Sequence, residues 1–243
     1  MLIEMGTRAL VFLVLAACSN DQFSGEDASA DVVEAGPQEA ATADVMEASP
    51  IESGPSTFCG TQASAFFCDD FESLAGPTDS FSVTTPAQPT TGTFAFGQGY
   101  KSGKGLTVKA GAASAAFATK QVQGDALHGF TFAIQIATGA IGVTYFHVKA
   151  QSSSFTLAAD VTGANIGIKG DSGNPQNVIT ADGNWHVFDV AFANGNASVA
   201  VDGKNPIGVP FAAAGSSSST MDVGIVTAAT LGGSVLFDDI ALR

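Results

Sequence analysis

The sequence predicts an all-β fold in which two antiparallel sheets pack face to face. Residues 56–243 are rich in Gly, Ala, Val, Phe, Ser and Thr, but they hold only seven Leu and one Glu, residue types that helices favour. Short segments of this region alternate apolar and polar side chains, and clusters of Gly, Asn, Asp and Ser separate these segments. Many short strands at such a spacing are typical of a two-sheet sandwich or a barrel.

One hairpin is predicted in detail, within "NWHVFDVAFANGNASVAVDGK" from Asn184 to Lys204. Both central positions of a type I′ turn need positive φ, and Asn194-Gly195 provides them. A two-residue loop then fixes the register, and a slip of one residue would invert both faces. Ala193 is predicted opposite Asn196 beside the turn. The next predicted partners are Phe192/Ala197, Val190/Val199 and Phe188/Val201 on an apolar face, and Val187/Asp202, Asp189/Ala200 and Ala191/Ser198 on a wetter face.

Further strands are predicted wherever the same alternation recurs. They cover residues 66–72, 104–109, 114–120, 130–136, 142–150, 155–161, 165–169, 176–180, 220–227 and 234–242. The Ala-rich stretch 110–118 is also compatible with a helix, but Gly and Ser interrupt it, so we predict a strand there.

The composition divides the chain into three pieces, 1–18, 19–55 and 56–243. The apolar run from Ala9 to Cys18 is too short to span a bilayer and fits the apolar core of a secretory signal peptide. Residues 19–55 hold nine acids and no Lys or Arg, which predicts a disordered acidic tether. The net charge of −14 argues against a nucleic-acid partner.

Leu15-Ala16-Ala17-Cys18 resembles the lipobox of bacterial lipoproteins. The resemblance implies cleavage before Cys18, a lipid on its sulfur and an exported protein anchored to the cell envelope. Ser19 follows the cysteine instead of the aspartate associated with inner-membrane retention, which favours the outer membrane. The alternative is an ordinary signal peptide with a chance cysteine.

The two remaining cysteines, Cys59 and Cys68, lie in "FCGTQASAFFCDDFE". An even pair in an exported protein predicts a disulfide, which would join the start of the module to its first strand. Two free buried thiols are the alternative.

The segment 184–204 resembles the Trp-His strand, hairpin and Asp-Gly of laminin-G-like and concanavalin A-like domains. "FFCDDFE" and "VLFDDIAL" resemble the first and last strands of such jelly rolls in bacterial surface proteins and carbohydrate-binding modules. The resemblance implies a two-sheet antiparallel jelly-roll sandwich whose terminal strands lie side by side. It does not define an activity, because such folds host many functions.

The residues that catalysis would need are scarce, so we predict that the protein is not an enzyme. Hydrolases of this fold carry Glu-x-Asp-x-x-Glu, and the sequence has no glutamate after Glu72. Polysaccharide lyases of the fold need an arginine, and Arg243 is the only one after the signal region. No Gly-x-Ser-x-Gly elbow and no zinc-ligand spacing occur.

Three residues are candidate ligand-binding residues: Tyr145, His147 and Trp185. Tyr145, His147 and Lys149 alternate, so they should share a face, which binds a ligand only if it is open and not turned to the other sheet. Trp185 could stack on a sugar ring, although a Trp and a His at the start of an inner strand usually pack at the edge of the core, and His186 is predicted on the apolar face.

Paired acids at both ends of the module predict a cation site. Asp238 and Asp239 point to opposite faces of a regular strand, so one carboxylate would lie among apolar side chains and need compensation. Calcium held by Asp70, Glu72 and Asp239 would provide it, as the resemblance also implies for the terminal strands. The equally weighted alternative is compensation by backbone N–H groups or lysines.

The sequence therefore favours a surface-anchored lipoprotein whose sandwich binds carbohydrate without catalysis. A structural or adhesive protein–protein module without a sugar site is the alternative. A degenerate glycoside hydrolase or polysaccharide lyase is the more distant one.

Overall fold

The structure is a computed structural model that describes residues 58–85, 92–101, 103–123, 127–137, 141–212 and 218–243. The predicted signal peptide, the lipid-bearing Cys18 and the predicted tether lie outside these residues. In the described part of the chain, no helix is long and apolar enough to cross a membrane.

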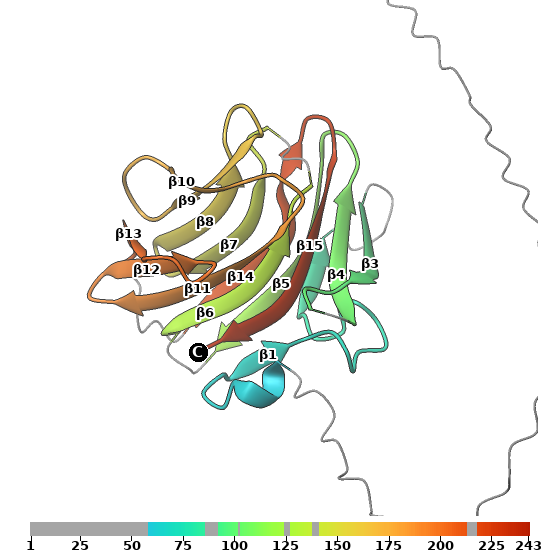
Figure 1. Ribbon diagram of the computed structural model, residues 1–243, viewed down its shortest axis with the longest axis horizontal. Helices are drawn as coiled ribbons and strands as arrows, with labels where there is room; N and C mark the ends of the chain where they lie inside the picture. Colours follow the sequence, from blue (N-terminus) through green and yellow to red (C-terminus); the bar gives the residue numbers. More distant parts are fainter. Residues whose placement is uncertain (1–57, 86–91, 102, 124–126, 138–140, 213–217) are drawn as a thin grey trace, which may run out of the picture. The chain divides into compact units, whose positions relative to one another are not determined.

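Two antiparallel sheets, called here sheet A and sheet B, pack against each other (Figure 1). Sheet A contains, in spatial order, β13 (Ile207–Pro210), β12 (Asn196–Val201), β11 (Trp185–Ala193), β6 (Gly129–Gln135), β15 (Gly233–Leu242), β4 (Lys104–Ala110) and β3 (Gly92–Gln98), with β1 (Phe67–Asp69) paired to β15. Sheet B contains β10 (Gln176–Thr180), β9 (Asn165–Lys169), β8 (Ser153–Ala159), β7 (Thr144–Ala150), β14 (Ser218–Ala229), β5 (Ser114–Gln123) and β2 (Val83–Thr85). A short 3₁₀ helix, η1 (Cys59–Thr61), precedes β1.

This arrangement confirms the predicted all-β fold and the resemblance to concanavalin A-like jelly rolls at the level of fold. The first and last strands pair directly, with Phe67 opposite Leu242. Cys59 and Cys68 form the predicted disulfide, which links η1 to β1. The Ala-rich stretch 110–118 is not a helix: Ala110 ends β4, residues 111–113 turn, and β5 begins at Ser114.

The β11–β12 hairpin has the predicted register at six of the seven pairs, from Ala193 opposite Asn196 to Phe188 opposite Val201. At the seventh pair β12 has ended, although the N–H of Asp202 still donates to the carbonyl oxygen of Val187 at 2.9 Å. Asn194 and Gly195 both have positive φ, at 51° and 75°, as a type I′ turn requires. Phe188 and Val190 on the apolar face are fully buried, so the predicted face is the one that meets sheet B.

Aromatic rings from both sheets interlock in the core. Phe132 of β6 stacks on Phe188 of β11 at 5.0 Å and on Phe146 of β7 at 4.3 Å, between ring centroids. All three side chains are fully buried. Because Phe146 comes from sheet B and the other two from sheet A, this stack fastens the two sheets together.

Three strands were not predicted, and all three lie at sheet edges: β2, β3 and β13. Edge strands bury few side chains and therefore show weaker alternation, and two of the three are only three or four residues long.

A register shift in β7 corrects the prediction for Tyr145. The pairing with β8 slips between Thr144 and Phe146, so one extra residue stands in β7 and the alternation changes phase. Tyr145 and Phe146 are both fully buried, whereas His147 and Lys149 lie on the outer face of sheet B. Tyr145 therefore does not share a face with His147, and its side chain belongs to the core.

A second register shift, in β15, resolves the problem of the paired acids. The pairing with β6 slips between Asp238 and Ala241, and Asp239 adopts a positive φ of 51°. The strand thus does not have the regular alternation assumed in the prediction. Phe237 and Ile240 face the core. Neither the carboxylate of Asp238 nor that of Asp239 therefore has to lie among the apolar side chains of the core.

Candidate ligand-binding surface

Two aromatic rings meet on the outer face of sheet A. Trp185 begins β11 opposite Gln135 of β6, and its ring centroid lies 6.0 Å from that of Tyr100. Both side chains are half-buried, so each exposes part of its ring. The Lys101 ammonium lies 5.5 Å from the centroid of the Tyr100 ring.

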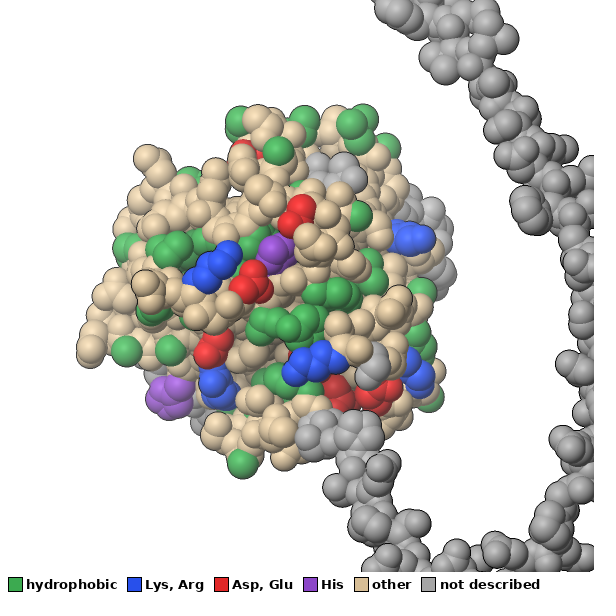
Figure 2. Space-filling model, in the orientation of Figure 1, with side chains coloured by type: hydrophobic (Ala, Val, Ile, Leu, Met, Phe, Trp, Pro, Cys, Tyr) green, Lys and Arg blue, Asp and Glu red, His purple; other side chains and the backbone are tan. Residues whose placement is uncertain are grey.

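Other partly exposed side chains extend this patch. Val187 follows Trp185 on the same face of β11, and Leu236 of β15 is in register with Gln135. We call Tyr100, Trp185, Val187 and Leu236 the aromatic platform. Hydrophobic side chains gather across the middle of the face shown in Figure 2, between charged groups.

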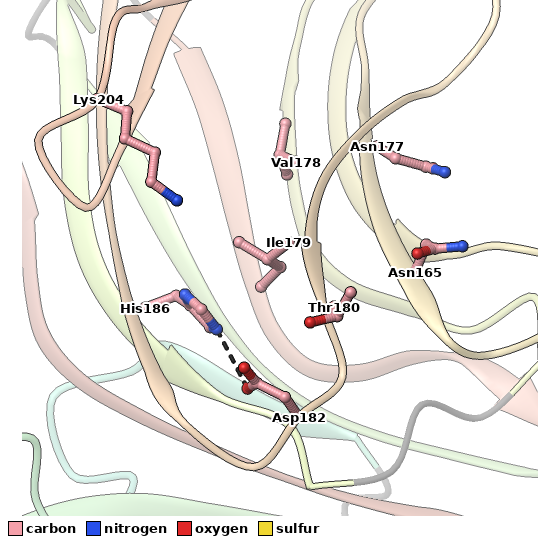
Figure 3. Close-up of a pocket in the computed structure, with 8 residues that line it drawn as sticks. All are labelled: Asn165, Asn177, Val178, Ile179, Thr180, Asp182, His186 and Lys204. Atoms are coloured by element: carbon pink, nitrogen blue, oxygen red, sulfur yellow. Dashed lines mark hydrogen bonds and ion pairs between the residues drawn. The ribbon is translucent and has the colours of Figure 1, made fainter.

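A cavity of about 400 Å³ adjoins the start of β11 (Figure 3). It lies between β9, β10 and the residues that lead into β11, with a lysine from the turn after β12 reaching in from the other side. Its lining combines an apolar floor with amide, hydroxyl, carboxylate, imidazole and ammonium groups. The residues are Asn165, Asn177, Val178, Ile179, Thr180, Asp182, His186 and Lys204.

His186 follows Trp185 and points to the cavity side of the strand (Figure 3). Its Nδ1 lies 2.8 Å from an oxygen of Asp202, and its Nε2 lies 3.3 Å from an oxygen of Asp182. Asp182 also accepts hydrogen bonds from the backbone and side chain of Asn184, which together with His186 lower the pKa of this carboxyl to about 2. The polar wall of the cavity is therefore fixed before any ligand arrives.

The sequence only partly predicts this surface. It names Trp185 and gives His186 the inner face, which the register with Ile134 confirms. It does not predict Tyr100, which lies in a Gly- and Lys-rich segment interpreted as a turn. No local signal brings Tyr100 to Trp185, because their contact depends on the pairing of β4, β15, β6 and β11.

His147, the third predicted ligand residue, lies on the other sheet. Its Nδ1 is 3.2 Å from Asp222 on β14, and Asp222 accepts a hydrogen bond of 2.7 Å from Thr119 on β5. These three side chains lie in one row across the outer face of sheet B. His147 and Trp185 are thus on opposite faces of the sandwich, and the structure does not bring the predicted ligand residues into one site.

The three predicted calcium ligands do lie near one another. Burial, with Asp70 and Glu72 nearby, raises the pKa of Asp239 to about 6, while Lys101 opposes this shift. However, an oxygen of Glu72 accepts the backbone N–H of Lys104 at 2.9 Å. In the described residues, no group of three or more His, Cys, Asp or Glu side chains is placed to hold a metal ion. As positioned, these acids do not form a ready cation site, and calcium stays a prediction.

Backbone donors compensate the most buried of the acids. Asp238, only 3% exposed, accepts the N–H groups of Tyr100 and Asp239 at 2.7 and 2.8 Å. Burial raises the pKa of this carboxyl to about 7, although these hydrogen bonds favour the charged form. Asp69 is likewise compensated by the N–H of Phe71 at 2.8 Å and by the Ser80 hydroxyl. This is the alternative that the sequence left open for the paired acids.

The described region is thus a β-sandwich with a partly exposed aromatic surface beside a polar cavity. No family model and no curated protein sequence matches the chain. Among solved structures, it is similar to a glycosyl hydrolase family protein from Mycobacterium fortuitum, with a TM-score of 0.49 and 14% identity over 74% of this chain and 99% of that one. It is also similar to SCLam, a non-specific endo-β-1,3(4)-glucanase of family GH16, with a TM-score of 0.48 and 10% identity over 73% of this chain and 89% of that one. A laminarinase from Flavobacterium sp. UMI-01 gives a TM-score of 0.46 and 9% identity over 74% of this chain and 99% of that one.

Proposed function

We propose that this protein is an exported, lipid-anchored protein that binds carbohydrate without catalysis. The observation that carries the proposal is the contact between Tyr100 and Trp185, with ring centroids 6.0 Å apart, on the outer face of sheet A, where both rings are partly exposed. The flat apolar face of an aromatic ring suits the C–H face of a pyranose. The platform is therefore a suitable surface for a sugar ring.

The cavity on the inner side of β11 is a second candidate ligand surface. A ligand site usually combines apolar walls with a few fixed polar groups that set orientation and specificity. Thr180, Asp182 and Lys204 offer a hydroxyl, a carboxylate and an ammonium group around Ile179 (Figure 3). Trp185 and His186 are consecutive residues of β11 and therefore point to opposite faces of the strand, so the platform and the cavity are two separate surfaces at the start of the same strand.

The lipid anchor rests on the lipobox-like sequence that ends at Cys18. Several acyl chains hold a protein firmly at a membrane where one chain would not. We expect mass spectrometry of the N-terminal peptide to find an acylated Cys18, and Cys18→Ser to move the protein out of the membrane fraction. An unmodified chain that is secreted in soluble form would refute the anchor and leave the glycan proposal standing.

The glycan proposal is tested with the full-length protein, purified in detergent, on an array of immobilised glycans. We expect binding to a limited set of glycans, measurably weaker in Trp185→Ala and in Tyr100→Ala. Leu231→Ala is the control, because Leu231 is an apolar side chain 86% exposed in the turn before β15. An array without signal, together with capture of a protein partner through the same platform, would instead favour the adhesive module.

A further inference from the structure

Side-chain carboxylates fix both ends of the β3–β4 turn, Gly99–Gly103, of which Ser102 is outside the described residues. The N–H of Tyr100 donates to Oδ2 of Asp238 at 2.7 Å. The N–H of Lys104, just after the turn, donates to Oε1 of Glu72 at 2.9 Å. Asp238 belongs to the last strand, β15, and Glu72 follows the first strand, β1. Residues from the two ends of the module therefore hydrogen-bond to the same turn.

The contacts of Glu72 leave little room beneath the turn. A Cβ on Gly103 would lie 1.6 Å from Oε1 of Glu72, and Gly103 has a positive φ of 80°. The ammonium of Lys104 also reaches back, to the carbonyl oxygens of Glu72 at 3.3 Å and Leu74 at 3.5 Å. Close packing and hydrogen bonds thus hold this end of the turn in one place.

Asp238 holds the Tyr100 end of the turn, and its own burial costs free energy. A carboxylate that is 3% exposed loses most of its hydration, and in the described residues it has no salt bridge to Lys, Arg or His. Its neighbour Asp239 adopts a left-handed backbone conformation, which costs free energy in a non-glycine residue. Core packing does not require this arrangement, because the carboxylate lies on the outer face of the sheet.

The hydrogen bonds that hold the turn also determine where the Tyr100 ring lies. Asp238 is in register with Ala133 of β6, and Ala133 is in register with Val187 of β11, so the outer face of sheet A leads from Asp238 to the platform. Ala133 is on this outer face and yet fully buried, so other groups cover it. The turn is held at Asp238 at one end of this row, and its Tyr100 ring lies against Trp185.

We propose that Asp238 and Glu72 are positioning residues of the carbohydrate site: by hydrogen-bonding the β3–β4 turn they hold the Tyr100 ring beside Trp185. The inference rests on the proposed function for the identity of the ligand. The hydrogen bonds from the turn to Asp238 and Glu72, called here the clamp, are independent of any ligand. In this role the acids order a binding surface through backbone N–H groups.

Trp185 is the only tryptophan of the chain, so its fluorescence reports on the clamp directly. In the full-length protein in detergent, we expect Asp238→Ala to change the emission of Trp185 and to expose it to a neutral quencher, as Tyr100→Ala does. Asp238→Asn keeps one acceptor oxygen and should give an intermediate effect. Asp189→Ala, which removes a mostly exposed acid on the outer face of β11, is the matched control and should change neither signal.

Binding to the glycan found on the array gives the second measurement. Loss of one aromatic contact predicts about 2- to 10-fold weaker binding for Asp238→Ala. If Asp238 acts only through Tyr100, the variant with both Asp238→Ala and Tyr100→Ala binds no more weakly than Tyr100→Ala alone. A double variant that is clearly weaker, or Trp185 fluorescence untouched by Asp238→Ala, would overturn the proposal.

Glu72 provides a variant whose folding is not at risk, because its side chain is exposed. Glu72→Ala should change Trp185 fluorescence in the same direction, and Glu72→Gln, which retains an acceptor for Lys104, should change it less. If no glycan binds the wild-type protein, the proposed function fails while the fluorescence series still decides the clamp.

Discussion

The rings of Phe132 and Phe188 lie parallel, with an interplanar angle of 1° and centroids 5.0 Å apart, on adjacent strands of sheet A. Phe132 also meets Phe146 of sheet B, so it stands at the centre of the contact between the sheets.

Replacing this central ring should therefore be costly. We expect Phe132→Ala to lower the free energy of unfolding by about 3–5 kcal/mol, because it removes buried contacts and leaves a cavity. Phe66→Ala, at a ring 38% exposed, should lower it by less than about 1 kcal/mol. Urea denaturation measures both, and equal losses in the two variants would contradict the assigned core.

Stability should fall as the pH rises from about 4 to about 7. Burial raises the folded-state pKa of Asp238 to about 7 and that of Asp239 to about 6, from 3.8. In this range the folded protein holds protons that the unfolded chain has released, so ionisation favours unfolding. After allowance for solvent screening, the effect should be on the order of 1–2 kcal/mol.

Asp239→Asn tests this expectation, since asparagine tolerates the positive φ of residue 239 and carries no charge. Its unfolding free energy, measured in urea at the two ends of the range, should depend less on pH than that of the wild type. Asp189→Asn should behave as the wild type does. A wild-type protein that becomes more stable across this range would show that Asp238 and Asp239 do not titrate as inferred.

The disulfide should stabilise the start of the module. Joining Cys59 to Cys68 closes a loop of about ten residues, which corresponds to about 2.7 kcal/mol in the chain-entropy model. Replacing both cysteines by serine should lower the melting temperature, and adding a reductant should lower that of the wild type but not that of the variant. Alkylation of Cys59 or Cys68 in the unreduced native protein would speak for free thiols.

Calcium at Asp70, Glu72 and Asp239 predicts a melting temperature that falls when a chelator is added and recovers with excess calcium. A site saturated 100-fold above its Kd would contribute about 2.7 kcal/mol. Asp70→Asn should then make the protein insensitive to the chelator. An unchanged wild-type melting temperature would refute the calcium prediction. Compensation of these acids by backbone N–H groups would then remain.

Local regularity explains how much of the fold could be predicted. The Asn194-Gly195 turn and the alternation beside it determine the hairpin register, because side chains two apart must meet the same environment. The disulfide likewise follows from an even pair of cysteines in an exported protein. Where one extra residue enters a strand, as at Tyr145, the period changes phase, and nothing in the local pattern marks the place.

By itself the sequence determined the all-β fold, the hairpin register and the disulfide partners, since these follow from periodicity, turn chemistry and residue type. Only the tertiary structure decided that Tyr145 is core, that His147 and Trp185 lie on opposite sheets, and that Tyr100 stands beside Trp185. Such contacts join residues distant along the chain, and their positions depend on strand order and on two register shifts that short-range patterns do not encode.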